Sequence, residues 1–153
     1  MKYILVESDF IYGHKVKSPF YVKYEEAVNE SIAILEASFP TDHLKINEIR
    51  KDFIGKEPTI VNDEEYYIMD VDHIFTEYHP EYMVGCENYF AVCAIDNGEV
   101  QKPCTSLCFS MDDAIKEFQK CCSSDIEKQL SSNWVVNLEG REYHLVHIVR
   151  EMC

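Results

Sequence analysis

The sequence predicts an α+β fold of two tandem ββαββ units, with helices packed on antiparallel sheet. Short stretches of alternating apolar residues, separated by turn signals, indicate strands. Two longer stretches repeat apolar residues every three or four positions, which is typical of helices with one buried face. These elements follow in the same order in both halves of the 153 residues. We therefore expect one helix per unit to cover one face of the sheet and the other face to meet water.

The first half contains four predicted strands. They comprise residues 3–9, 15–22, 59–62 and 66–75. Pro19 favours an edge position or a strand start for the second of them, because proline cannot donate to a strand ladder. The acidic residues 63–65 form the predicted turn between the last two strands.

A helix is predicted between these strand pairs, at residues 24–39. One face of it is apolar, and Pro40 ends it. Residues 41–54 fit either a short helix or irregular chain. In the helical interpretation, Thr41 or Asp42 supplies the N-cap.

The second half repeats this order. Strands are predicted at residues 88–95, 100–109, 134–138 and 142–149, and a helix at residues 110–130. Ser110 and Asp113 have the spacing of a capping box, with Asp in the usual Glu position. Ser123 and Ser124 are the point at which this helix would break. Asp96-Asn97-Gly98 is a strong hairpin turn signal.

The two halves align without a gap where strand enters helix. Residues 20–30 lie over residues 107–117. Either an ancient duplication or the generic order of hairpin then helix explains this match, and the matched acids and a shared tyrosine favour duplication. We predict one compact domain with three parts. They are the first unit at residues 1–78, with an inserted segment 41–57, an acidic linker at 79–87, and the second unit at 88–153.

Negative charge is concentrated in one stretch of the chain. The net charge is −14, and residues 57–101 contain eleven acids but no lysine or arginine. A fold does not require such segregation, whereas recognition of a basic surface would use it. The same charge repels nucleic acid and anionic membranes, so we expect neither to bind directly.

The cellular compartment is predicted from two missing signals, a membrane-spanning segment and a signal peptide. No apolar run is long enough to span a bilayer, and the first residues contain an acid too early for a signal peptide. All seven cysteines lie in the second half, and their number is odd. We therefore expect reduced thiols and a cytoplasmic protein, in the host cytosol if the gene is carried by a phage.

The strand at residues 66–75 is the most informative one. Alternation separates Tyr67, Met69, Val71, His73 and Phe75 from Tyr66, Ile68, Asp70 and Asp72. The first set suits a core, and the second suits a surface that carries aromatic rings and acids. On that surface Asp70 and Asp72 would lie about 6.6 Å apart.

Acids and tyrosines interleave along this strand and the segment after it. The predicted partner-binding residues are Asp63, Glu64, Glu65, Tyr66, Asp70, Asp72, Glu77, Tyr78, Glu81, Tyr82 and Glu87. Such a surface presents charge as a phosphate backbone does, so the cationic groove of a nucleic-acid-binding protein could accept it. Tyrosine is enriched at interface hot spots. The alternative is that these acids only keep the protein soluble.

Three chemical sites compete with this interpretation. Asp70 and Asp72 could bind Mg²⁺ or Mn²⁺ for phosphoester hydrolysis, although no glycine-rich loop or nearby cation accompanies them. Zinc ligands could come from four cysteines and two histidines, although their spacings are unsuitable: Cys104, Cys108, Cys121, Cys122, His144 and His147. A cysteine or serine nucleophile has no local signature. We predict no cofactor, no metal and no catalytic residue.

The leading hypothesis is a non-enzymatic acidic inhibitor. It would bind a basic nucleic-acid-handling protein and occlude its groove, as phage anti-defence proteins of the anti-CRISPR or anti-restriction type do. An immunity protein for a basic nuclease toxin would use the same electrostatics. A divalent-metal-dependent phosphoesterase using Asp70 and Asp72 is the alternative from another class. Exposed hairpin edges could pair between two copies of the chain, so the sequence leaves both a monomer and a homodimer as alternatives.

Overall fold

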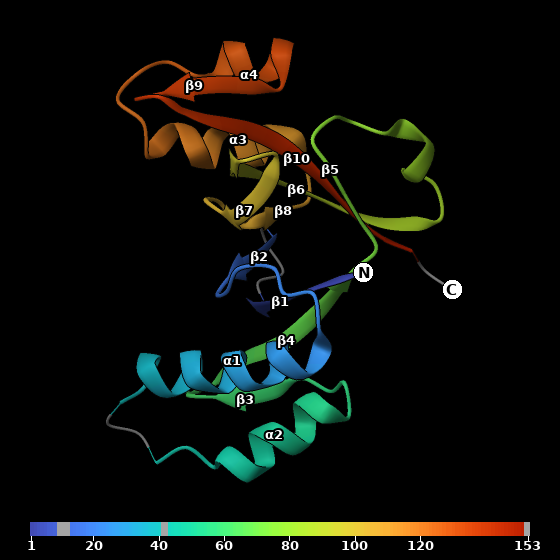
Figure 1. Cartoon of the computed structure of the whole chain (residues 1–153), viewed down its shortest axis with the longest axis vertical. Coiled ribbons are helices and arrows are strands. Elements are labelled where there is room, and N and C mark those ends of the chain that lie inside the picture. Colours follow the sequence, from blue (N-terminus) through green and yellow to red (C-terminus); the bar gives the residue numbers. More distant parts are fainter. Residues whose placement is uncertain (9–12, 41–42, 152–153) are drawn as a thin grey trace.

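The computed structural model describes residues 1–8, 13–40 and 43–151, and its architecture is mixed α+β (Figure 1). The described residues contain four helices: α1 (Tyr24–Ser38), α2 (Ile46–Ile54), α3 (Met111–Lys120) and α4 (Glu127–Asn133). A short 3-10 helix, η1, spans Pro80–Tyr82. The strands are β1 (Lys2–Glu7), β2 (Gly13–Val16), β3 (Thr59–Val61), β4 (Glu64–Val71), β5 (His73–Phe75), β6 (Cys86–Asp96), β7 (Glu99–Pro103), β8 (Leu107–Cys108), β9 (Val135–Leu138) and β10 (Arg141–Glu151).

The ten described strands form one antiparallel sheet that curls toward itself. Their order is β3-β4-β1-β2-β8-β6-β10-β5, and β7 and β9 add to β6 and β10. A single residue, Asp72, separates β4, which is next to one end of this order, from β5 at the other end. The Asp72 N–H donates to the backbone oxygen of Val149 in β10, at 3.0 Å. The two ends of the sheet are thereby joined.

The curled sheet encloses a core to which both halves of the chain contribute. Its buried members come from β1, β4, β6, β8 and β10: Ile4, Val6, Met69, Val71, Tyr89, Ala91, Cys93, Leu107, Val146 and Ile148. Because residues far apart in the sequence share this core, the two halves are stabilised by the same burial of apolar surface.

Helices cover the outer face of the sheet at both ends (Figure 1). α1 and α2 pack on β4 through a cluster that includes Leu35, Phe53 and Tyr66. α3 and α4 pack on the other end through a cluster that includes Phe118, Leu130 and Leu145. The expectation that one sheet face meets water is therefore wrong, because the curl buries the inner face and the helices bury the outer one.

Several sequence-predicted boundaries change in the structure. The strand predicted at residues 66–75 is divided at Asp72, and the strand at residues 100–109 becomes β7 and β8. The helical interpretation of residues 41–54 is confirmed as α2, but Lys45 is at its N-cap, so the prediction of Thr41 or Asp42 as the cap was wrong. Thr41, Asp42 and Asp9, at the end of the first predicted strand, lie outside the described residues. Descent of the two halves from one duplicated unit stays a prediction.

Local signals in the second half are confirmed. The Ser110 side chain accepts a hydrogen bond from the Asp113 backbone N–H at 3.2 Å, which caps α3. The predicted break at Ser123 and Ser124 separates α3 from α4. Asn97 and Gly98 both have positive φ, at 52° and 77°, as the type I′ hairpin turn requires.

Gly13 marks the contact between the two halves of the sheet. It pairs with Cys108 of β8 and has a φ of +139°. A Cβ atom here would lie 2.1 Å from the backbone oxygen of Leu107, which cannot move without disturbing β8. We expect Gly13→Ala to lower the free energy of unfolding by about 2–4 kcal/mol.

Urea denaturation measures this difference, with Gly98→Ala as the matched control. Gly98 also has positive φ, but a Cβ there would meet open space. Its replacement should cost only about 1 kcal/mol. Equal losses in the two variants would show that the β2–β8 contact does not limit stability.

Candidate functional site

The predicted partner-binding residues do not form one continuous surface. Asp63 and Glu64 lie at the exposed turn between β3 and β4, where Asn62 and Asp63 have positive φ. Glu65 is half-buried beside it. Asp63 and Asp70 are seven positions apart along extended chain, which is roughly 23 Å at the rise of a strand. Asp63 and Glu64 are thus remote from the others, whereas Glu65 lines the same pocket as Asp70.

Tyr66 is a core residue. It is 4% exposed and packs under α1 and α2, and its hydroxyl donates to Glu7 at 3.5 Å. Burial, together with the charge of Glu7, raises the pKa of Tyr66 to about 12. The surface predicted from alternation was wrong at Tyr66 and Ile68, because helices cover that face of β4.

Asp70 and Glu87 are paired with a cation that lies outside the acidic stretch. Arg150 of β10 contacts the Asp70 carboxylate through Nη2 at 2.7 Å and Glu87 through Nη1 at 2.7 Å. Its Nε also donates to the backbone oxygen of Asp70 at 2.8 Å. Burial would raise the pKa of Asp70, but the hydrogen bond and charge of Arg150 outweigh it and hold that pKa below its ordinary value. Both carboxylates are therefore already engaged.

Asp72 has a different role from Asp70. Its carboxylate accepts a hydrogen bond from the backbone N–H of Glu151 at 2.7 Å, so it ties the β4–β5 junction to β10. Asp70 and Asp72 also line different pockets. Within the described ranges, no three or more His, Cys, Asp or Glu side chains are grouped so that they could hold a metal ion.

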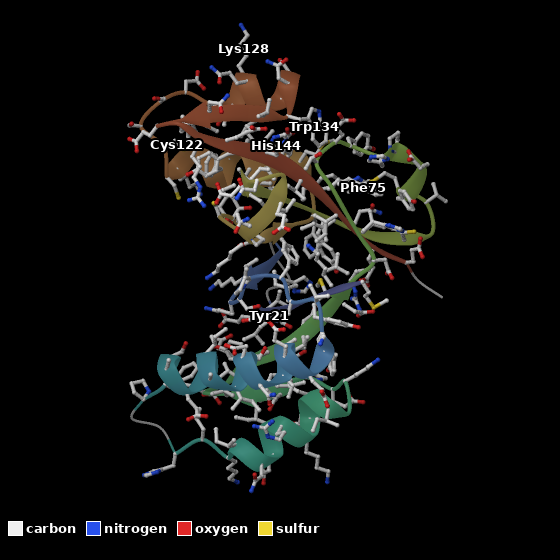
Figure 2. All side chains as sticks on the ribbon, viewed as in Figure 1. Tyr21, Phe75, Cys122, Lys128, Trp134 and His144 are labelled. Carbon is white, nitrogen blue, oxygen red and sulfur yellow. The ribbon has the colours of Figure 1, made fainter. Side chains whose placement is uncertain are left out.

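The segment after β5 is packed against the sheet. In residues 76–85, which pass through η1, His79 stacks on Phe75 of β5 with ring centroids 3.8 Å apart. Tyr82 lies against Phe75 as well, at 5.3 Å, and Tyr78 stacks on Trp134 at 5.9 Å. Figure 2 labels Phe75 and Trp134 in the half of the molecule where this loop leaves the sheet. Of the predicted acids here, Glu77 and Glu81 are exposed.

A buried histidine of β10 holds this loop. His147 is fully buried, and its Nδ1 accepts a hydrogen bond from the backbone N–H of His79 at 3.1 Å. The other ring nitrogen, Nε2, lies 2.7 Å from Oδ1 of Asn88. The Asn88 amide donates to the backbone oxygens of Tyr82 and Cys86, at 3.0 and 3.1 Å, which leaves Oδ1 as an acceptor. His147 is therefore neutral, with its proton on Nε2.

This arrangement predicts a pH dependence of stability. Burial, with a smaller contribution from the charge of His79, lowers the pKa of His147 to about 4, and Glu81 opposes this more weakly. The unfolded histidine titrates near 6.5. The stabilisation is thus complete above pH 6.5 and is lost as the pH falls toward 4, by about 2–3 kcal/mol in total.

Urea denaturation at about pH 7 and about pH 4.5 tests this pH dependence. His147→Gln lacks the titrating ring and serves as the reference for all other groups that titrate in this range. We expect the wild type to lose more stability than the variant. Parallel losses would contradict a neutral, buried His147.

An acidic groove lies beside the start of this loop. Its volume is about 500 Å³, and it is lined by β5, the first residues of the chain and the turn before β7. Three carboxylates line it, those of Asp72, Glu77 and Glu99, together with the rings of Phe75 and His79. Lys2 is a basic residue of the same lining. The groove therefore combines negative charge with an aromatic ring.

Sequence reasoning missed part of this region. Glu99 was not among the predicted partner-binding residues. Its position in the stretch without lysine or arginine could have identified it. Phe75 was assigned to a core, and His73, His79 and His147 carried no local motif. Of the predicted residues, the structure brings Asp72 and Glu77 to the groove. Tyr78, Glu81 and Tyr82 belong to the adjoining loop.

Comparisons with known proteins gave no match among family models, curated proteins or solved structures. In the part of the chain that the structure describes, no helix has the length and apolarity needed to cross a membrane.

Proposed function

We propose that this chain is a non-enzymatic inhibitor that binds a basic nucleic-acid-handling protein and occludes its nucleic-acid groove. The observation that supports this function best is the acidic groove lined by Asp72, Glu77 and Glu99. A protein that holds nucleic acid presents lysine and arginine along its binding site. Those side chains are the complement of this groove.

The groove offers two favourable interactions to a lysine or arginine side chain. The carboxylates attract the charged head, and partial removal from water strengthens that attraction. The Phe75 ring, which is stacked with His73 and His79, lines the same space and offers apolar surface to the aliphatic stem of that side chain. Lys2 lies in the lining and would have to move aside or contact the partner elsewhere.

The proposal places this protein among phage anti-defence proteins of the anti-CRISPR or anti-restriction type, acting in the host cytosol. The net charge of −14 favours rapid association of this chain with a basic partner, which it attracts over about a Debye length. We also propose that the two halves of the fold descend from one duplicated ββαββ unit.

Capture from the lysate of host cells at low and high salt tests this function. The wild-type chain should retain a nucleic-acid-binding protein at low salt and lose it at high salt, because screening weakens charge complementarity. The identity of the retained protein separates a defence enzyme from a nuclease toxin. If no nucleic-acid-binding protein is retained at low salt, the proposal is wrong.

A further inference from the structure

The loop at residues 76–85 presents two apolar side chains to water. Val84 is 87% exposed and Met83 is 42% exposed. They follow η1 and precede Gly85, whose φ of +81° turns the chain back into β6. Figure 1 shows this loop standing out from the side of the sheet. Exposed apolar side chains at the tip of a projecting loop are a feature of interaction sites.

The loop is fixed from below by buried contacts. The backbone N–H of His79 donates to the fully buried His147. The Asn88 amide binds the backbone oxygens of Tyr82 and Cys86, on either side of the two apolar residues. The His79 ring also stacks on Phe75. The tip is therefore ordered before any partner arrives, which lowers the entropy lost on binding.

Acids border the two apolar residues on both sides in the chain. Glu81 precedes them in η1, Glu87 follows them in β6, and Glu77 begins the same loop. Glu87 is paired with Arg150, and the exposed Glu81 contacts Nδ1 of His79 at 2.8 Å, whereas Glu77 is exposed. The side chains around the tip thus combine an apolar centre with an acidic border.

We propose that this loop is the anchor of the interface, and that Met83 and Val84 enter an apolar pocket bordered by lysine or arginine on the partner. This inference rests on the proposed function, since it assigns the pocket to the same basic nucleic-acid-handling protein. The acidic groove and the loop share residues Glu77 and His79, so both contact one continuous region of the partner. His147 and Asn88 are positioning residues, because they hold the loop without reaching its tip.

Val84→Ser tests the anchor, with Ile60→Ser as the matched control. Ile60 is 72% exposed on β3, at the opposite end of the molecule, so both changes remove an exposed apolar side chain. The probe is the basic nucleic-acid-binding protein retained by the wild-type chain at low salt. We expect Val84→Ser to weaken its binding at least about 10-fold and Ile60→Ser to change it less than about 2-fold.

Salt dependence distinguishes the anchor from the groove. The fold loss in Val84→Ser should stay the same as salt is raised over the range in which the wild type still binds, because apolar contact is not screened. A photo-crosslinking phenylalanine analogue placed at position 84 should join covalently to that protein, and the same analogue at position 60 should not. Equal binding by the two serine variants, or equal crosslinking at the two positions, would overturn the anchor while the proposed function stands. Failure to retain any nucleic-acid-binding protein would overturn both.

Discussion

Replacing His147 with alanine is expected to lower the free energy of unfolding by about 3–5 kcal/mol. The side chain is fully buried and stacks on Phe90 with ring centroids 4.8 Å apart. Its removal leaves a cavity and takes away the acceptor of the His79 N–H. The loop should therefore separate from β10 before the rest of the protein unfolds.

The single tryptophan reports this separation directly. Trp134 stacks on Tyr78 of the loop, so its emission should change in His147→Ala under conditions in which the far-UV circular dichroism is still native. His144→Ala is the control, because His144 lies on the same strand at an odd spacing and faces away from this cluster. Similar stability losses and unchanged tryptophan emission in both variants would rule out the anchoring role of His147.

Reversing two charges in the acidic groove is expected to reduce binding to the basic partner by about 10-fold or more at low salt. Glu77→Lys combined with Glu99→Lys places cations where the partner's cations would lie. Both positions are exposed, so folding should be unaffected. The fold loss should shrink as salt is raised over the range in which the wild type still binds, because screening reduces repulsion as well as attraction.

The matched control carries the same change in net charge elsewhere. Glu30→Lys combined with Glu36→Lys alters two exposed positions of α1, far from the groove along the sheet. Its affinity should stay within about 3-fold of the wild type if the groove, rather than total charge, determines binding. Equal losses in the two double variants would mean that only net charge matters.

The sequence predicted those parts of the fold that local chemistry determines. The Ser110 cap, the Asn97-Gly98 turn and the serine break between α3 and α4 depend on neighbouring residues, and each is confirmed. The α+β class followed from periodicity in the same way. These features can be predicted from the sequence because the interactions that stabilise them join residues only a few positions apart.

The features that the sequence did not predict depend on contacts between distant residues. His79 and His147 are 68 positions apart, and Asp70 and Arg150 are 80 apart. The alternation of β4 correctly separated its two faces, but it could not show that helices cover the face of Tyr66. The acidic stretch predicted a charged region. Only the curl of the sheet brings Asp72, Glu77 and Glu99 together in one groove.

If this chain occupies the partner's nucleic-acid groove, it must displace nucleic acid that is already bound there. In a displacement experiment, labelled nucleic acid is bound to the retained partner, and its fluorescence anisotropy is followed as the chain is added. We expect the wild-type chain to release the nucleic acid competitively, and Glu77→Lys/Glu99→Lys to require about 10-fold more protein for the same release. Binding of the chain while the nucleic acid stays bound, in a ternary complex, would contradict occlusion of the groove.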